Sequence, residues 1–192
     1  MVLVIATENK HKGEELASIL RQEMEIDVRT LADFPGVKLP PETGSTYREN
    51  AVQKALAAAK ATGHWAMGDD SGMEVDALGG APGLYSARFA GEGVTYADNR
   101  KKVLDLLGDR PDDQRTARFL CTIALASPEG KVEVVEGRCE GRITRRDVGE
   151  GDSDTIRSSS CRPTTRRSPS FLRGRKIGSA IGDRPSGPRF RF

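Results

Sequence analysis

Two adjacent carboxylates between glycines are the first residues of this chain that could carry chemistry. Asp69 and Asp70 stand in the segment Gly68-Asp69-Asp70-Ser71-Gly72, directly after the short apolar run 65–67. Neighbouring carboxylates repel each other unless a cation or a proton relieves them. Because consecutive residues at a strand end point to opposite sides, one aspartate could bind a metal ion or activate water while the other hydrogen-bonds the loop. The plain alternative is a turn whose Asp and Ser side chains satisfy nearby backbone donors, and the pattern alone leaves both open.

A second polar cluster, Thr7-Glu8-Asn9-Lys10-His11-Lys12, follows the apolar run Val2–Ala6. The run predicts a buried strand, and the apolar spacing after the cluster predicts a helix over about 12–23. A turn from strand to helix presents backbone N–H groups and the positive end of the helix, which suit a phosphate. Lys10 and Lys12 add ammonium donors. An ordinary polar loop is the competing interpretation.

Glu42 lies in a proline- and glycine-rich loop, residues 35–45, ahead of an alanine-rich helix expected over 46–62. A carboxylate on a loop suits a hard cation such as Mg²⁺, although it could equally stabilise the start of the helix. Asn50 and Lys54 are four residues apart and share one face of that helix, so both could point at one ligand or at solvent.

The elements that must position these residues follow a strand and helix alternation that ends in an antiparallel pair. Further strands are expected at 26–31, 65–68, 73–78, 118–127 and 132–139, and a helix at 96–107. The expected turn between strands 65–68 and 73–78 holds the two aspartates. This order predicts an α/β fold with a mixed, twisted sheet flanked by helices.

Composition excludes several classes of protein. Residues 145–192 hold 12 Lys and Arg against 5 Asp and Glu, whereas the whole chain is only +2, so residues 1–144 are mildly acidic. An acidic body argues against a general nucleic-acid binder. No apolar run approaches a membrane span, and the start lacks the features of a signal peptide. Few histidines and widely spaced cysteines argue against a zinc site, and we expect a cytoplasmic protein.

Four motifs occur in a particular order along residues 1–144. They are Thr7-x-Asn9-x-x-Lys12, the run from Glu42-Thr43-Gly44 to Lys54-Ala55, Asp69-Asp70-Ser71-Gly72, and the run Leu78-Gly79-Gly80-Ala81-Pro82-Gly83-x-Tyr85-Ser86-Ala87-Arg88. This arrangement resembles the inosine triphosphatase, or Ham1-like, family, with one departure at Glu8, where the family usually has glycine. The resemblance implies two lobes around a nucleotide cleft. It also implies Mg²⁺-dependent hydrolysis of ITP, dITP and XTP to the monophosphate and pyrophosphate by a homodimer.

The resemblance also implies roles for single residues. Asp70 would be the base that activates water and, with Glu42, would hold Mg²⁺, while Ser71 would contact the substrate. The triphosphate would be held by the residues Thr7, Glu8, Asn9, Lys10, His11, Lys12 and Lys54. Two other functions stay open: a Maf-like pyrophosphatase for modified pyrimidine nucleotides, and a non-enzymatic RNA-binding protein that acts through its basic tail.

The character of the sequence changes near Thr144. Residues 145–192 hold 11 arginines and 8 serines and almost no periodicity, so we expect this tail to be largely disordered. The family continues with a Gly-Tyr-Asp-Pro motif and a later Ser-His-Arg motif, which are absent here. Codons chosen for residues 153–159 and then read one base out of frame can encode Gly-Tyr-Asp-Pro-Ile-Phe. Codons for residues 174–183, read with the same shift, can encode Glu-Lys-Asp-Arg-Ile-Ser-His-Arg-Gly. We therefore hypothesise that the domain 1–144 is followed by an out-of-frame tail, with the frame lost between about residues 144 and 151.

Overall fold

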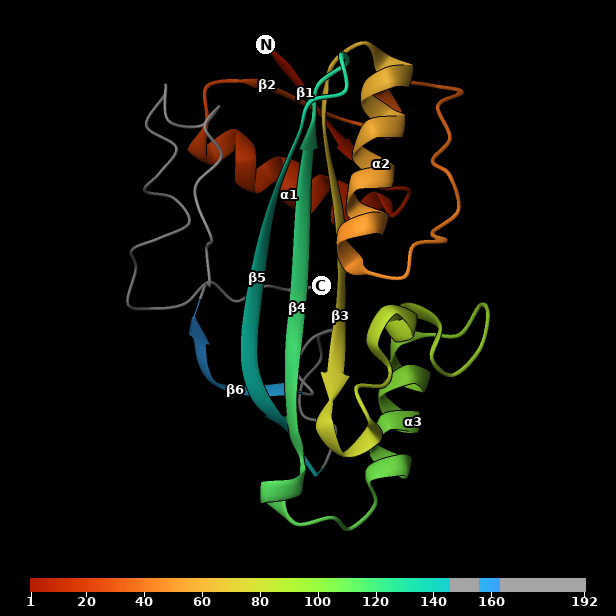
Figure 1. Cartoon of the computed structure of the whole chain (residues 1–192), viewed down its shortest axis with the longest axis vertical. Helices are drawn as coiled ribbons and strands as arrows, with labels where there is room; N and C mark the ends of the chain where they lie inside the picture. The colour runs from red at the N-terminus through yellow and green to blue at the C-terminus, as the bar shows by residue number, and fades with distance from the viewer. Residues whose placement is uncertain (146–155, 163–192) are drawn as a thin grey trace. The chain divides into compact units, whose positions relative to one another are not determined.

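The computed structural model describes residues 1–145 and 156–162 of the chain (Figure 1). The described residues divide into two compact units. The first unit comprises residues 1–70 and 122–136, and the second comprises residues 71–121, 137–145 and 156–162. In this part of the chain, no helix is both long enough and apolar enough to cross a membrane.

The strands form one six-stranded sheet in the order β2-β1-β3-β4-β5-β6. In chain order they are β1 (Val2–Ala6), β2 (Asp27–Thr30), β3 (Trp65–Val75), β4 (Thr116–Ala126), β5 (Val132–Ile143) and β6 (Ile156–Arg162). β1 pairs in parallel with both β2 and β3, whereas β5 and β6 are antiparallel. The predicted mixed sheet is therefore confirmed.

The α-helices are α1 (Lys10–Glu23), α2 (Tyr47–Thr62) and α3 (Tyr96–Leu107). Each begins at a residue whose side chain accepts a hydrogen bond from the first turn: Asn9, Thr46 and Thr95. Such caps satisfy backbone N–H groups that have no partner within the helix. α2 ends at Gly63, which adopts the left-handed conformation (φ 69°) that a helix C-terminus often requires.

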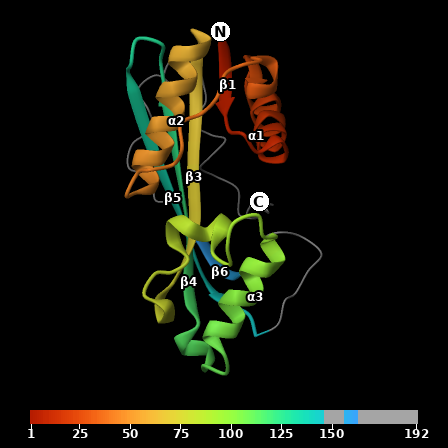
Figure 2. The same ribbon diagram turned by 90° about the vertical axis from the view of Figure 1, so that its right-hand side faces the viewer.

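In the first unit, α1 and α2 cover opposite faces of the sheet (Figure 2). The alternation of side chains along the strands separates two cores. Leu3, Ile5 and Met67 pack with Ala17 of α1. Val4 and Ala66 pack with the alanines of α2. The two helices therefore approach neighbouring residues of the same strand from opposite sides.

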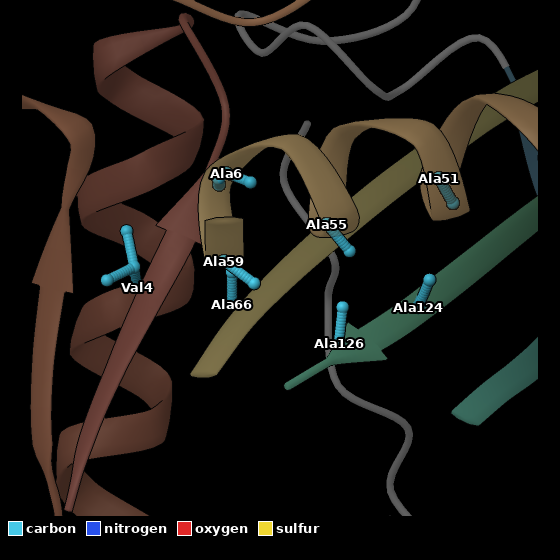
Figure 3. Close-up of a cluster of buried hydrophobic side chains, with 9 residues drawn as sticks. Val4, Ala6, Ala51, Ala55, Ala59, Ala66, Ala124 and Ala126 are labelled. Atoms are coloured by element: carbon cyan, nitrogen blue, oxygen red, sulfur yellow. The ribbon is translucent and has the colours of Figure 1, made fainter. Parts of the chain in front are cut away.

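The core between α2 and the sheet consists largely of alanine (Figure 3). From the helix it receives Ala51, Ala55, Ala58 and Ala59, all fully buried, and from the strands Ala6, Ala66, Ala124 and Ala126. Small side chains on both surfaces let the backbones of helix and sheet come close together. The closest approach is at Gly68, where a Cβ atom would overlap the carbonyl oxygen of Ala51 and lie 2.7 Å from the nitrogen of Ala55.

The second unit has its own core around α3. Val103 and Leu107 of that helix pack with Val75, Ala117 and Ile143. Arg115, only 1% exposed, donates hydrogen bonds to the carbonyl oxygens of Gly108, Ile143 and Thr144. Its guanidinium group thereby ties the end of β5 to the end of α3.

Three expectations need correction or restriction. The predicted turn at Asp69-Asp70-Ser71-Gly72 is wrong, because β3 runs without a break from Trp65 to Val75. The expected strand 73–78 is divided between the end of β3 and a short 3₁₀ turn at Asp76–Leu78. Of the tail expected to be disordered, Ile156–Arg162 forms β6 on the edge of β5, and residues 146–155 and 163–192 lie outside the described residues.

Candidate active site

The two aspartates lie on opposite faces of β3. Side chains alternate along a strand, so Asp69 points to the face covered by α1 and Asp70 to the face covered by α2. Both are buried, with 3% and 9% of their surfaces exposed. Buried carboxylates need charged or hydrogen-bonding partners, and each helix supplies one.

Lys12 of α1 forms an ion pair with Asp69. The lysine side chain is 23% exposed, so its ammonium group lies at the edge of the solvent while the aspartate is buried. The resemblance assigned Lys12 to the triphosphate, and the structure pairs it with the first aspartate. A substrate phosphate that binds Lys12 would therefore compete with the Asp69 carboxylate for the lysine ammonium group, or would share that group with it.

Asn50 of α2 connects Asp70 to the loop that carries Glu42. Its Nδ2 donates a hydrogen bond of 2.9 Å to Asp70 Oδ2, and its Oδ1 accepts one of 2.8 Å from the backbone N–H of Gly44. Asn50 is 3% exposed. The expectation that Asn50 points at a ligand or at solvent is therefore wrong, because its side chain is used inside the protein.

Glu42 and Lys54 form a second ion pair. Lys54 Nζ lies 2.6 Å from Glu42 Oε1, and the lysine side chain is only 12% exposed. Helix α2 thus contributes both the amide that contacts Asp70 and, one turn later, the ammonium group that contacts the loop carboxylate. The structure brings together Glu42, Asn50, Lys54 and Asp70 around the start of α2.

The polar turn 7–12 follows the end of β1. Ala6 is paired with Gly68, so Thr7 and Asp69 each come directly after the paired residues of two parallel strands. Asn9 Oδ1 accepts the N–H of Lys12 at 3.1 Å, and Thr7 Oγ1 accepts the N–H of Asn9 at 3.3 Å. These short-range bonds order the turn and give Lys12 its place beside Asp69.

The remaining predicted residues are less closely grouped. Glu8 Oε1 accepts the N–H of Leu39 at 3.4 Å, whereas Lys10 and His11 are exposed in the first turn of α1. Ser71 follows Asp70 on β3 and is half-buried. Within residues 1–145, no group of three or more His, Cys, Asp or Glu side chains is arranged to hold a metal ion.

Two glycines allow this arrangement. Gly68 lets the backbone of α2 lie directly on β3, which brings Asn50 within reach of Asp70. At Gly44, a Cβ atom would lie 2.6 Å from Asn50 Oδ1 and would block the bond that the amide accepts. Both positions therefore need glycine because of close approach.

Sequence reasoning offered the other aspartate of the pair only a bond to its loop, so it missed the ion pair of Asp69 with Lys12 and the structural use of Asn50. Strand alternation was the available signal for Asp69, because two adjacent carboxylates in a strand need separate partners on its two faces. The partner of Asp70 could not be identified locally, since Asn50 lies 20 residues earlier in the chain.

Comparison with known proteins shows the family of the chain. A model of the Ham1 family matches residues 3–154. The chain belongs to the Ham1 family. A Ham1-family relative from Desulforamulus reducens, named dITP/XTP pyrophosphatase, is 52% identical over 151 residues, which are 79% of this chain and 75% of the relative. A protein of the same name from Exiguobacterium sibiricum is 47% identical over 143 residues, covering 74% of this chain and 72% of the relative.

Solved Ham1 structures share the fold. The Ham1 protein of Coxiella burnetii superimposes with a TM-score of 0.71 at 39% identity, covering 81% of this chain and 80% of the other. The dITP/XTP pyrophosphatase of Mycobacterium abscessus gives 0.69 at 37% identity, covering 85% and 87%. The family resemblance and the fold class predicted from the sequence are confirmed.

Proposed function

We propose that this chain hydrolyses purine nucleoside triphosphates with a non-standard base, such as dITP, XTP and ITP, to the monophosphate and pyrophosphate. The observation that carries the proposal is the cluster around the start of α2, in which Asp70 is bonded to Asn50 and Lys54 to Glu42. The names of the relatives, each dITP/XTP pyrophosphatase, support the substrate class. No observation favours a pyrimidine substrate or an RNA-binding function.

In this proposal Asp70 accepts a proton from the attacking water. The oxygen of that water forms a bond to phosphorus, the α–β phosphoanhydride bond breaks, and pyrophosphate leaves with the electron pair of that bond. A buried carboxylate held in one direction by a hydrogen bond suits such a base. Lys54 lies one helical turn after Asn50 on the same helix, so it is the lysine proposed to keep the reacting phosphates within reach of Asp70.

Lys12 and Lys54 are proposed to bind the triphosphate, with the turn 7–12 at the start of α1. In the structure both ammonium groups are paired with carboxylates, Asp69 and Glu42. When a highly charged anion binds the two lysines, the carboxylates lose their positively charged partners and need another cation. This requirement favours a substrate that arrives together with a divalent cation.

Mg²⁺ is the proposed cation, held by Glu42 and Asp70. Mg²⁺ binds through one or two carboxylates, several waters and substrate phosphates, so the two oxygen donors present here fit it without a larger protein cage. When bound, the ion would neutralise charge that develops on the phosphate oxygens. The role of Ser71 as a substrate contact is likewise a proposal.

A pyrophosphate-release assay on a panel of nucleotides tests the function. We expect release from dITP, XTP and ITP to exceed that from dATP and dGTP, to need Mg²⁺ and to be lost in Asp70→Asn. A preference for modified pyrimidine nucleotides would contradict the substrate class. We also propose a cytoplasmic homodimer, which light scattering of the purified protein and cell fractionation test.

The tail is proposed to be the product of a lost reading frame, which would leave the 192-residue chain with weak activity. The family match ends at residue 154, and about a quarter of the Desulforamulus reducens relative lies outside the matched region. Sequencing the gene across codons 144–151 tests this directly: an intact frame there refutes the proposal. Restoring the frame should raise dITP and XTP hydrolysis well above that of the 192-residue chain. Strong hydrolysis by the 192-residue chain itself would contradict the predicted impairment.

A further inference from the structure

A shared five-residue pattern, Thr-Tyr-x-acidic-Asn, begins one helix in each of the two units. Thr46-Tyr47-Arg48-Glu49-Asn50 starts α2, and Thr95-Tyr96-Ala97-Asp98-Asn99 starts α3. In each, the threonine hydroxyl accepts the N–H of the acidic residue, at 3.1 Å in α2 and 3.2 Å in α3. In each, the carboxylate returns to a backbone N–H at the helix start, that of Ser45 at 2.7 Å and that of Thr95 at 2.8 Å.

The asparagine that ends each copy is buried and bridges two segments. Asn50 Oδ1 accepts the N–H of Gly44 at 2.8 Å, and Asn99 Oδ1 accepts the N–H of Ala90 at 2.7 Å. The exposed fractions are 3% and 6%. Because a backbone N–H can only donate, it determines which end of the amide is the oxygen. The nitrogen of each amide must then face the other way.

The two copies differ in what that nitrogen contacts. Asn99 Nδ2 donates to the backbone carbonyl oxygen of Ala87 at 3.0 Å. Asn50 Nδ2 donates to the carboxylate oxygen Oδ2 of Asp70 at 2.9 Å. Asn99 in α3 therefore connects two backbone segments, whereas Asn50 in α2 connects the backbone to the side chain of Asp70, which has a proposed chemical role.

We propose that Asn50 is a positioning residue that sets the direction of the Asp70 carboxylate. The Gly44 N–H orients the amide, the amide nitrogen orients the carboxylate, and close contact of α2 with β3 at Gly68 fixes the distance. The kinetic consequence rests on the proposed function of Asp70. The structural consequence, a carboxylate held in one rotamer, does not depend on it.

Asn50→Asp and Asn50→Ala separate positioning from simple support of the loop. Aspartate keeps an oxygen that can accept the Gly44 N–H, but it places a second oxygen against Asp70 where the donor was. Alanine loses both bonds. If Asn50 only held the loop, the aspartate variant would be the milder one. If Asn50 positions Asp70, the aspartate variant is at least as harmful as the alanine variant. We then expect kcat to fall about 100-fold, as for a misplaced reacting group, and KM to change much less.

Asn99→Asp and Asn99→Ala are the matched controls. They remove equivalent buried hydrogen bonds from an equivalent helix start, so we expect a comparable loss of thermal stability. Measured well below the melting temperature, their kcat should stay within about three-fold of the unsubstituted chain, a difference below 1 kcal/mol. Equal loss of kcat in the Asn50 and Asn99 pairs would overturn the positioning role.

Crystal structures of the unsubstituted 192-residue chain, Asn50→Asp and Asn99→Asp give a second measurement that needs no activity. We expect the Asp70 carboxylate to turn away in Asn50→Asp and to keep its rotamer in Asn99→Asp. An unchanged Asp70 rotamer in Asn50→Asp refutes the proposal even if the enzyme is active. A displaced Asp70 in a chain that hydrolyses none of the nucleotides still supports the positioning role, and hydrolysis by the frame-restored chain then tests the proposed function separately.

Discussion

Lys54 and Glu42, one expected to bind phosphate and the other metal, are bound to each other through a hydrogen bond of 2.6 Å. In the structure, the ammonium group of Lys54 and the carboxylate of Glu42 therefore neutralise each other. The lysine side chain is 12% exposed and the glutamate side chain 34%, so the bond is open to solvent on the glutamate side. Binding of a metal–triphosphate complex must exchange these partners, the carboxylate turning to the cation and the ammonium group to phosphate.

Lys54→Gln should weaken substrate binding. A hydrogen bond to a charged group contributes about 1.5–3 kcal/mol, so KM for dITP should rise roughly 10- to 100-fold. Steady-state kinetics at saturating Mg²⁺ measure the change. Lys60→Gln, an exposed lysine at the end of the same helix, is the control and should leave KM unchanged. Equal effects of the two substitutions would indicate that only the general charge of α2 matters.

Asp70→Asn should abolish hydrolysis without unfolding the protein. Asparagine keeps an oxygen that can accept the hydrogen bond from Asn50, so the packing of α2 on β3 is retained. Loss of the proton acceptor should lower kcat by about 10²- to 10⁴-fold. Pyrophosphate release measures the loss of activity, and a thermal melt on the same sample measures folding. Asp105→Asn, at an exposed position of α3, is the control. A variant that retains full kcat would exclude Asp70 as the base.

Gly68→Ala should destabilise the first unit, because the new methyl group would overlap the carbonyl oxygen of Ala51. Overpacking of this kind costs about 1–3 kcal/mol, measured here as a lower midpoint in urea. In Gly137→Ala, the added atom would meet nothing closer than the carbonyl oxygen of Cys121 at 3.9 Å, so this control should be close to neutral. Comparable midpoints for the two variants would mean that α2 can move off the sheet at little cost.

Glu49 should make the start of α2 sensitive to acid. Hydrogen bonds from the hydroxyl and N–H of Ser45 lower the pKa of Glu49 below its usual 4.5. A depressed carboxyl pKa contributes stability that is complete above the unfolded-state pKa and is lost as the pH falls through the folded-state pKa. The melting-temperature difference between the unsubstituted chain and Glu49→Gln should thus be largest near neutral pH and shrink below about pH 4.5. In Ser45→Ala the loss should be complete at a higher pH, and a gap that stays constant from pH 7 to pH 3 would contradict this assignment.

Local signals predicted the helices well and the site only in part. α2 and α3 begin and end where their caps are, and caps are read from adjacent residues. The turn predicted at Asp69 and Asp70 failed because charged residues between glycines are rare inside a strand. What permits them there is non-local: Lys12 and Asn50 come from two helices that flank the strand.

Apart from Val4, every fully buried side chain in the core between α2 and the sheet is an alanine, so methyl groups set the spacing of the two backbones there. Most protein interiors can change in sequence over evolution, since a larger residue at one place is balanced by a smaller one nearby. At its alanine positions this interior can become smaller only through glycine, and Gly68 already takes that place at the closest contact. Adaptation of the enzyme to a new temperature or substrate must therefore come from other surfaces, because any thickening here would lift Asn50 away from the carboxylate that it holds.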